Sequence, residues 1–175
     1  LERGRIFISI DEIENAFDDL FEAYSIDTTH LDVLGEIGNL YLSELMFEDA
    51  IDAFSALLEL DPLSDIALYN RGLAYLYNEN ALKALDDFKK AIQIEPEEVN
   101  YHLGKGNAYL QMRDEMNAIE SFLYAVELEM GNMEAVFNLA MAYAGFDKFE
   151  ESYKLLTEIE QKDPEYPGLY FQKAN

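Results

Sequence analysis

The chain has 175 residues, of which 36 are acidic and 12 are basic, so its formal net charge is −24 at pH 7. A charge of this sign opposes binding to nucleic acid and to the anionic surface of a membrane. No apolar run approaches the roughly 20 residues of a membrane-spanning helix, and the absence of cysteine excludes disulfides and thiolate metal sites.

Similar residues recur along the chain with a period of about 34 residues. The columns are Tyr41, Tyr75, Tyr109 and Tyr143; Gly38, Gly72, Gly106 and Ala140; Ala50, Ala84, Ala118 and Ser152; and Phe54, Phe88, Phe122 and Leu156. This period is typical of tandem helical hairpins, in which each unit buries its apolar face against its neighbour. The sequence therefore predicts one continuous array, with full units at 31–64, 65–98, 99–132 and 133–166.

The two ends of the chain fall inside units of the array. Residues 1–30 are expected to hold the end of a first helix and a complete second helix, because Ala16, Leu20 and Ala23 continue the columns. Residues 6–10 also favour strands, but their phase agrees with the repeat and predicts a helix. Residues 167–175 are expected to start a further first helix, and since the chain opens at Leu1 we expect a fragment of a longer protein.

The unit 65–98 shows most clearly how one repeat is built. Apolar residues at helical spacing predict a first helix over 65–77, which Asn78–Asn80 interrupt. The same spacing from Leu82 to Ile92 predicts a second helix, which ends before Pro96 because proline lacks the amide that a helix needs.

Small residues at Gly72 and Ala84 are expected to let the two helices of this unit approach closely, with Tyr75 and Phe88 filling the space beside the contact. A large residue at Gly72 would then overpack the hairpin, at a cost of about 1–3 kcal/mol.

These columns resemble the tetratricopeptide repeat (TPR). The residues that carry the resemblance best are Leu68, Gly72, Tyr75, Ala84, Phe88, Ala91 and Pro96. Local departures are Ala140 and Ser152 in the last full unit and Met130 in place of a terminal proline. The resemblance implies an all-α fold, a right-handed superhelix of antiparallel helix–turn–helix repeats.

The resemblance also implies that the first helices line a concave groove that binds a peptide. The positions expected to face it are Asn39, Leu42, Tyr69, Asn70, Leu73, Tyr77, Leu103, Asn107, Gln111, Phe137, Asn138 and Met141. The pairs Asn39 with Asn70 and Asn107 with Asn138 resemble asparagines that hold the backbone of an extended peptide in some members, since an amide both donates and accepts. The alternative is that Tyr69, Leu73 and Tyr77 pack between first helices and the asparagines bond neighbouring turns.

The charge of the first-helix stretches indicates the kind of peptide. Their net charge is −2, from Asp32, Glu36, Asp65 and Glu134 against Arg71 and Lys105. A groove of this kind suits an uncharged or mildly basic segment. Binding of a chaperone tail through a carboxylate clamp is disfavoured, because the matching positions hold Gly35, Asn100 and Gly104 rather than cations.

Other polar residues suggest no chemistry. His102 stands at an apolar position and is expected in the core, and the acidic pairs at 18–19, 48–49 and 86–87 are expected on solvated faces of second helices. Two histidines without cysteine do not form a familiar zinc set, and the carboxylates lack the spacing of a calcium loop. Phosphate loops and nucleophile motifs are absent, so no enzyme, metal site or cofactor is expected.

The leading hypothesis from the sequence is a non-catalytic scaffold, expected in the cytoplasm, that binds a peptide or protein segment in the groove. The partner is of unknown identity, and nucleic acid and membrane insertion are not expected. The alternatives are a self-association module, with a homodimer through the end repeats, and a regulatory arm of an enzyme that lies outside this chain.

Overall fold

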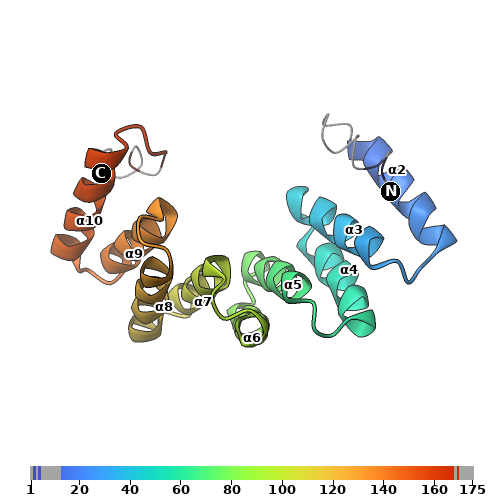
Figure 1. The fold of residues 1–175 in the computed structure, drawn as a ribbon, viewed down its shortest axis with the longest axis horizontal. Helices are drawn as coiled ribbons and strands as arrows, with labels where there is room; N and C mark the ends of the chain where they lie inside the picture. Colours follow the sequence, from blue (N-terminus) through green and yellow to red (C-terminus); the bar gives the residue numbers. More distant parts are fainter. Residues whose placement is uncertain (1, 3, 5–12, 168, 170–175) are drawn as a thin grey trace. The chain divides into compact units, whose positions relative to one another are not determined.

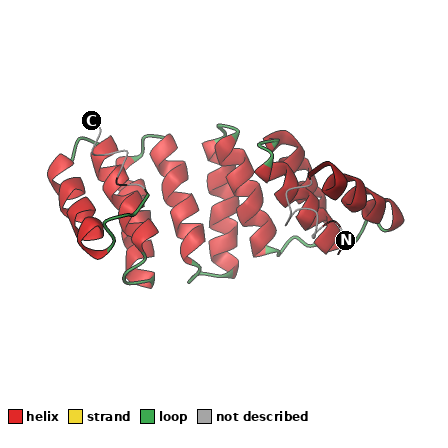
Figure 2. Cartoon of the chain, turned by 90° about the horizontal axis from the view of Figure 1, so that it is seen from above, coloured by secondary structure: helices red, strands yellow, loops and turns green. Residues whose placement is uncertain are grey.

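The computed structural model of the chain describes residues 2, 4, 13–167 and 169, and all regular secondary structure in this part is helical (Figures 1 and 2). The chain divides into two compact units, residues 1–96 and 97–175, which are described separately. The helix expected over 6–10 and most of the segment expected to start a helix at 167–175 lie outside the described residues. The all-α fold class predicted from the sequence is confirmed.

Helices alternate with short connections in both units. The first unit contains α2 (Ile13–Ile26), α3 (Leu31–Ser43), α4 (Phe47–Leu60), α5 (Asp65–Tyr77) and α6 (Ala81–Ile94). The second contains α7 (Val99–Gln111), α8 (Glu115–Leu128), α9 (Met133–Gly145) and α10 (Phe149–Lys162). The hairpins are α3 with α4, α5 with α6, α7 with α8, and α9 with α10. The exact division of the chain into repeats stays a prediction.

The turn inside each hairpin follows one backbone pattern. In the α5–α6 hairpin Glu79 has a φ of 58°, its N–H donates to the carbonyl of Leu76, and the N–H of Asn80 donates to the carbonyl of Tyr75 at 2.8 Å. These two bonds form a Schellman motif, which satisfies carbonyls that the helix end leaves open. The same left-handed φ recurs at Leu45, Arg113 and Asp147. The tyrosine column therefore marks the residue whose carbonyl closes each turn.

Side-chain caps define where several helices begin. Ser64, Asn80, Asp114 and Asn132 each accept a hydrogen bond from the backbone N–H three residues later, at the starts of α5, α6, α8 and α9. Such a cap satisfies one of the amides that the first turn leaves without an intrahelical partner. Polar residues just before these apolar stretches therefore mark where the four helices begin.

A glycine facing a phenylalanine sets the spacing of three hairpins. A Cβ atom at Gly38 would lie 2.7 Å from Phe54 Cε1, one at Gly72 would lie 2.7 Å from Phe88 Cε1, and one at Gly106 would lie 2.6 Å from Phe122 Cε1. The three rings are almost fully buried. The close approach predicted at Gly72 is confirmed. In the fourth hairpin the equivalent positions hold Ala140 and Leu156. Alanine is larger than glycine and leucine is smaller than phenylalanine, so the two changes in size offset each other.

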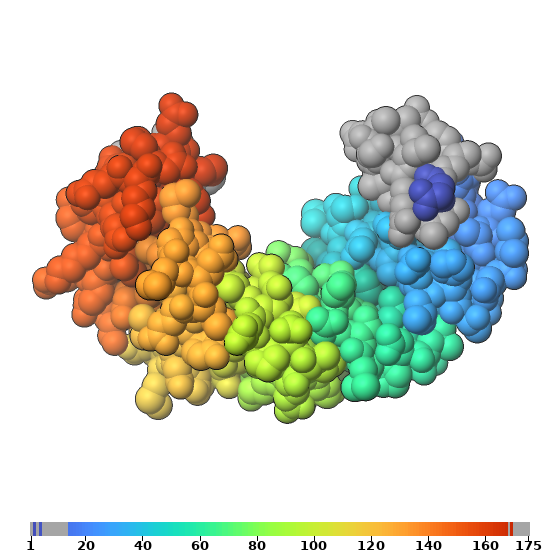
Figure 3. All heavy atoms as spheres, viewed as in Figure 1, coloured from blue at the N-terminus to red at the C-terminus, as the bar shows by residue number. Residues whose placement is uncertain are grey.

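Buried clusters join each hairpin to the next one within a unit. In the first unit one cluster contains Leu20 of α2, Ile37 of α3 and Ala53 of α4, and a second contains Phe54 of α4 and Ala67 of α5. In the second unit Phe122 of α8 and Leu139 of α9 share one cluster. Side chains fill the space between the ribbons of neighbouring helices (Figure 3). Each hairpin therefore covers part of its neighbour's apolar surface.

Candidate functional site

Two of the expected site residues meet between the first helices of the first unit. The side-chain Nδ2 of Asn70 on α5 donates a hydrogen bond to Oδ1 of Asn39 on α3 at 2.9 Å. Asn39 is exposed and Asn70 is half-buried. A side-chain amide carries two donors and an acceptor with two lone pairs, so this single bond leaves donor and acceptor capacity on both residues. The pair can therefore bond a peptide group while it links the two helices.

The asparagines of the second unit are arranged differently. Asn107 on α7 and Asn138 on α9 are both half-buried. No corresponding hydrogen bond joins their side chains, although both residues lie in the described part of the chain. Gln111, at the end of α7, is exposed. The two units thus differ at positions that the sequence treats as equivalent.

The aromatic residues expected in the groove lie against other rings. Tyr69 packs on Phe88 of α6 with ring centroids 5.9 Å apart, and Tyr77 stacks on Phe47 of α4 at 5.5 Å. Phe137 of α9 packs on Tyr166 at 5.5 Å. Tyr69 and Tyr77 therefore contact second helices, whereas the alternative interpretation places them between first helices. Leu42, Leu73 and Met141 are half-buried.

The prediction that Leu103 faces the groove is wrong. It is only 4% exposed and belongs to the apolar cluster of Ala118, Phe122 and Leu139. A side chain packed in the core cannot contact a peptide on the surface, so Leu103 does not belong to the candidate site. Its neighbour His102 is also buried, with its ring 4.6 Å from that of Tyr124, as expected for a core histidine.

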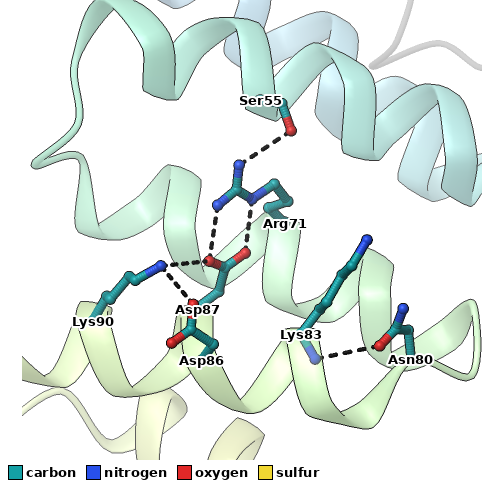
Figure 4. A network of polar contacts seen from close by, with 7 residues as sticks. All are labelled: Ser55, Arg71, Asn80, Lys83, Asp86, Asp87 and Lys90. Atoms are coloured by element: carbon teal, nitrogen blue, oxygen red, sulfur yellow. Dashed lines mark hydrogen bonds and ion pairs between the residues drawn. The ribbon is translucent and has the colours of Figure 1, made fainter.

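A buried ion pair lies beside the candidate site and joins three helices of the first unit (Figure 4). Arg71 of α5 binds Asp87 of α6 in a bidentate manner, with Nε to Oδ2 at 2.7 Å and Nη2 to Oδ1 at 2.8 Å. Its Nη1 donates to Oγ of Ser55 on α4 at 3.1 Å. The Asp87 side chain is 3% exposed and that of Arg71 is 18% exposed. This paired geometry is the kind that stabilises an otherwise costly buried carboxylate.

The expectation that the acidic pairs are solvated is wrong for Asp87 and for Asp19, which are both buried. The residues before them, Asp18 and Asp86, are exposed. Successive helix residues point about 100° apart, so one member of an acidic pair can turn inward while the other stays in water. The identity of the adjacent residue therefore does not reveal which carboxylate is buried.

The repeat columns hold a signal that points to this ion pair. The positions one repeat before and after Arg71 hold Ile37 and Lys105, and those one repeat before and after Asp87 hold Ala53 and Ser121. Both positions are apolar in the repeat 31–64, which holds Ile37 and Ala53, whereas they carry opposite charges in the repeat 65–98. Two columns that change character together indicate that their side chains touch.

The ion pair changes the electrostatics expected for the first helices. The hydrogen bonds that Arg71 donates to Asp87, together with the negative charge of Asp87, outweigh the cost of burial and raise the pKa of Arg71 above its ordinary value. The positive charge of Arg71 is thus balanced by a second-helix carboxylate. Arg71 therefore adds no unbalanced positive charge to the first helices of this unit, which also carry Asp32, Glu36 and Asp65.

Metal ligands do not gather in the part of the chain that the structure describes. No group of three or more histidine and carboxylate side chains is placed there to hold a metal ion. Within the same residues, each helix is too short or too polar to cross a lipid bilayer.

Residues 66–98 match the family model of the tetratricopeptide repeat. No curated protein sequence matches the chain at a significant level. Among solved structures, MamA is 22% identical with a TM-score of 0.82, covering 93% of this chain and 97% of that one. A tetratricopeptide repeat protein from Parabacteroides merdae is 22% identical with a TM-score of 0.87, covering 95% and 65% respectively.

A further similar structure is that of YrrB, described as a TPR protein with an unusual peptide-binding site. It is 19% identical with a TM-score of 0.76, and the match covers 98% of this chain and 89% of that one. These likenesses establish the fold as that of the α–α superhelix class. Residues 66–98 thus match one tetratricopeptide repeat, and the chain shares its fold with solved tetratricopeptide repeat proteins.

Proposed function

We propose that the chain is a non-catalytic scaffold whose first helices bind an extended segment of a partner protein. The single observation that carries the proposal is the hydrogen-bonded pair of Asn39 and Asn70 on α3 and α5. An extended peptide has backbone N–H and C=O groups that lose their water on binding, and each needs a partner. The remaining capacity of two adjacent amides meets this need without selecting a side chain.

The surroundings of the pair favour a neutral or mildly basic segment. Asp32 and Asp65 lie on the same two helices, and Arg71 is balanced by Asp87. Leu42 and Leu73 are half-buried and give the segment limited apolar contact. In the second unit, Asn107, Asn138, Gln111, Phe137 and Met141 are the residues that we propose for the same role. The peptide-binding site described for YrrB supports binding by an array of this fold.

Alanine at both Asn39 and Asn70 is expected to weaken such binding by about three- to tenfold, because two hydrogen bonds to the peptide backbone are lost. The probes are 12-residue peptides selected by phage display against the whole chain, and the affinity is measured by isothermal titration calorimetry. The matched control is Asn78→Ala, which removes an exposed amide beyond the end of α5. Peptides that bind both variants equally would exclude the asparagine pair from the site.

Self-association is a second candidate function, favoured by an apolar surface on α10. Phe149 is 64% exposed and Tyr153 is 73% exposed, and they line a hollow of about 320 Å³ with Leu156 and Leu169. Exposed aromatic residues of this size often mark protein contacts.

If this surface joins two copies, light scattering will show a dimer at about 100 µM that dissociates on dilution. Phe149→Glu should then give a monomer at every concentration, and the equivalent position of the preceding repeat already holds Glu115. A wild-type chain that stays monomeric over the whole concentration range would contradict this candidate.

A further inference from the structure

The outer face of α8 carries apolar side chains that stay partly exposed. Met116 is 76% exposed, Leu123 is 41% exposed and Tyr124 is 44% exposed. With Ile119 they line an open groove of about 780 Å³, together with the charged residues Glu115, Glu120, Glu127 and Lys148. All these residues belong to the second unit, and none of them is among the residues of the proposed first-helix site.

The other second helices provide an internal comparison, because they occupy the same place in the repeat. Positions equivalent to Met116 hold Glu48, Leu82 and Glu150; those equivalent to Leu123 hold Ser55, Lys89 and Thr157; those equivalent to Tyr124 hold Ala56, Lys90 and Glu158. The hairpin therefore folds with polar residues at these positions. The hairpin fold does not require the apolar surface of α8, so the surface needs another explanation.

The charges around the groove indicate the sign of its occupant. Lys148 is paired with Glu115 at 2.7 Å. Glu120 is exposed, as is Glu127, and neither forms an ion pair within the described residues. A surface on which apolar and acidic side chains lie next to one another complements a segment that carries both leucine-like side chains and lysine or arginine. A second copy of this chain has only 12 basic residues against 36 acidic ones, so it offers few cations to Glu120 and Glu127.

The backbone of the groove indicates the conformation of its occupant. The lining residues run from Glu115 to Glu127 along one helix, a length of about 18 Å at 1.5 Å per residue. Since α8 uses its own peptide groups internally, it offers no free backbone partner to an extended strand. A helix satisfies its own backbone and needs only side-chain contacts, which is the helix-in-groove mode of recognition.

We propose that the outer face of α8 is a docking surface for a basic amphipathic helix of about three turns from a partner protein. Met116 and Leu123 contact the apolar face of that helix, and Glu120 and Glu127 bind its lysine or arginine side chains. This surface is separate from the first-helix site, so the chain can hold two segments of its partners at once.

The test uses a synthetic 15-residue helical peptide with leucine on one face and lysine on its flanks, labelled with fluorescein. Its binding to the whole chain is measured by fluorescence anisotropy. The double variant Met116→Glu and Leu123→Thr is expected to weaken binding about tenfold, because the apolar contact is lost. Its fold should be unchanged, since Glu150 and Thr157 occupy the equivalent positions in α10. The matched control Leu82→Glu, at the position equivalent to Met116 in α6, should change affinity less than twofold.

The added glutamate makes the outcome decisive. Attraction by general charge alone would be strengthened by a further negative side chain, so the double variant would bind the lysine peptide as tightly as the wild type or more tightly. That result would overturn the proposal, as would an absence of binding by the wild type. Amide chemical shifts that change on α8 would support it, and changes confined to the first helices would contradict it.

Discussion

Replacing Asp87 with alanine is expected to lower the free energy of unfolding by about 2–4 kcal/mol, because it leaves the guanidinium of Arg71 without its carboxylate. The side chain of Arg71 is 18% exposed, so water offsets part of this cost. Chemical denaturation followed by circular dichroism measures the change. Lys90→Ala is the matched control, since it removes an exposed charge near the same carboxylate and should cost less than about 1 kcal/mol.

The same ion pair is expected to be replaceable as a unit. The double variant Arg71→Leu and Asp87→Leu reproduces the side chains found at Leu139 and Leu155, which are the equivalent positions of the last full unit. Replacement of a buried ion pair by apolar residues of similar volume is often neutral or stabilising. We therefore expect a stability within about 1 kcal/mol of the wild type. A double variant as unstable as Asp87→Ala would show that the pair is not interchangeable with an apolar contact.

Replacing Gly72 with alanine is expected to destabilise the chain by about 1–3 kcal/mol. The new Cβ would lie 2.7 Å from Phe88 Cε1, so the helices or the fully buried ring would have to shift. Alanine is the better helix former by about 1 kcal/mol, so propensity alone predicts the opposite sign. Gly35→Ala is a suitable control, since its Cβ would meet Leu57 Cδ1 at an ordinary 3.6 Å. Equal stabilisation by both substitutions would contradict the close contact at Gly72.

The fold can be predicted from the sequence because its determinants repeat. Glycine against phenylalanine, the tyrosine at each turn and the polar residues at helix starts recur at fixed spacing, so one unit predicts the others. The pair of Asn39 and Asn70 can also be anticipated, since equivalent first helices place these positions near each other. The sequence pattern places Leu103 at the surface, whereas the structure buries it. A repeat column shows which residues are equivalent, but it does not show how deeply each equivalent side chain is buried.

The residues that differ from the repeat are harder to predict. The ion pair of Arg71 and Asp87 occurs in one of the full repeats. The burial of Asp87 depends on Arg71, and the other full repeats lack an arginine at the equivalent position. The apolar face of α8 is also hard to predict, because the overall charge of the chain suggests that the outer surfaces of all second helices are acidic. In both cases the useful signal is a column that changes character, since such a change is not imposed by the common fold.

Paired columns of the repeat act together through direct contact, and the coupling free energy between positions 72 and 88 measures that contact. Unfolding is measured for the wild type, Gly72→Ala, Phe88→Leu and the double variant, which imitates Ala140 and Leu156 of the fourth hairpin. The double variant should be more stable than the sum of the single changes predicts, by at least about 1 kcal/mol. Strictly additive effects would mean that the two positions do not share the contact on which the hairpin depends.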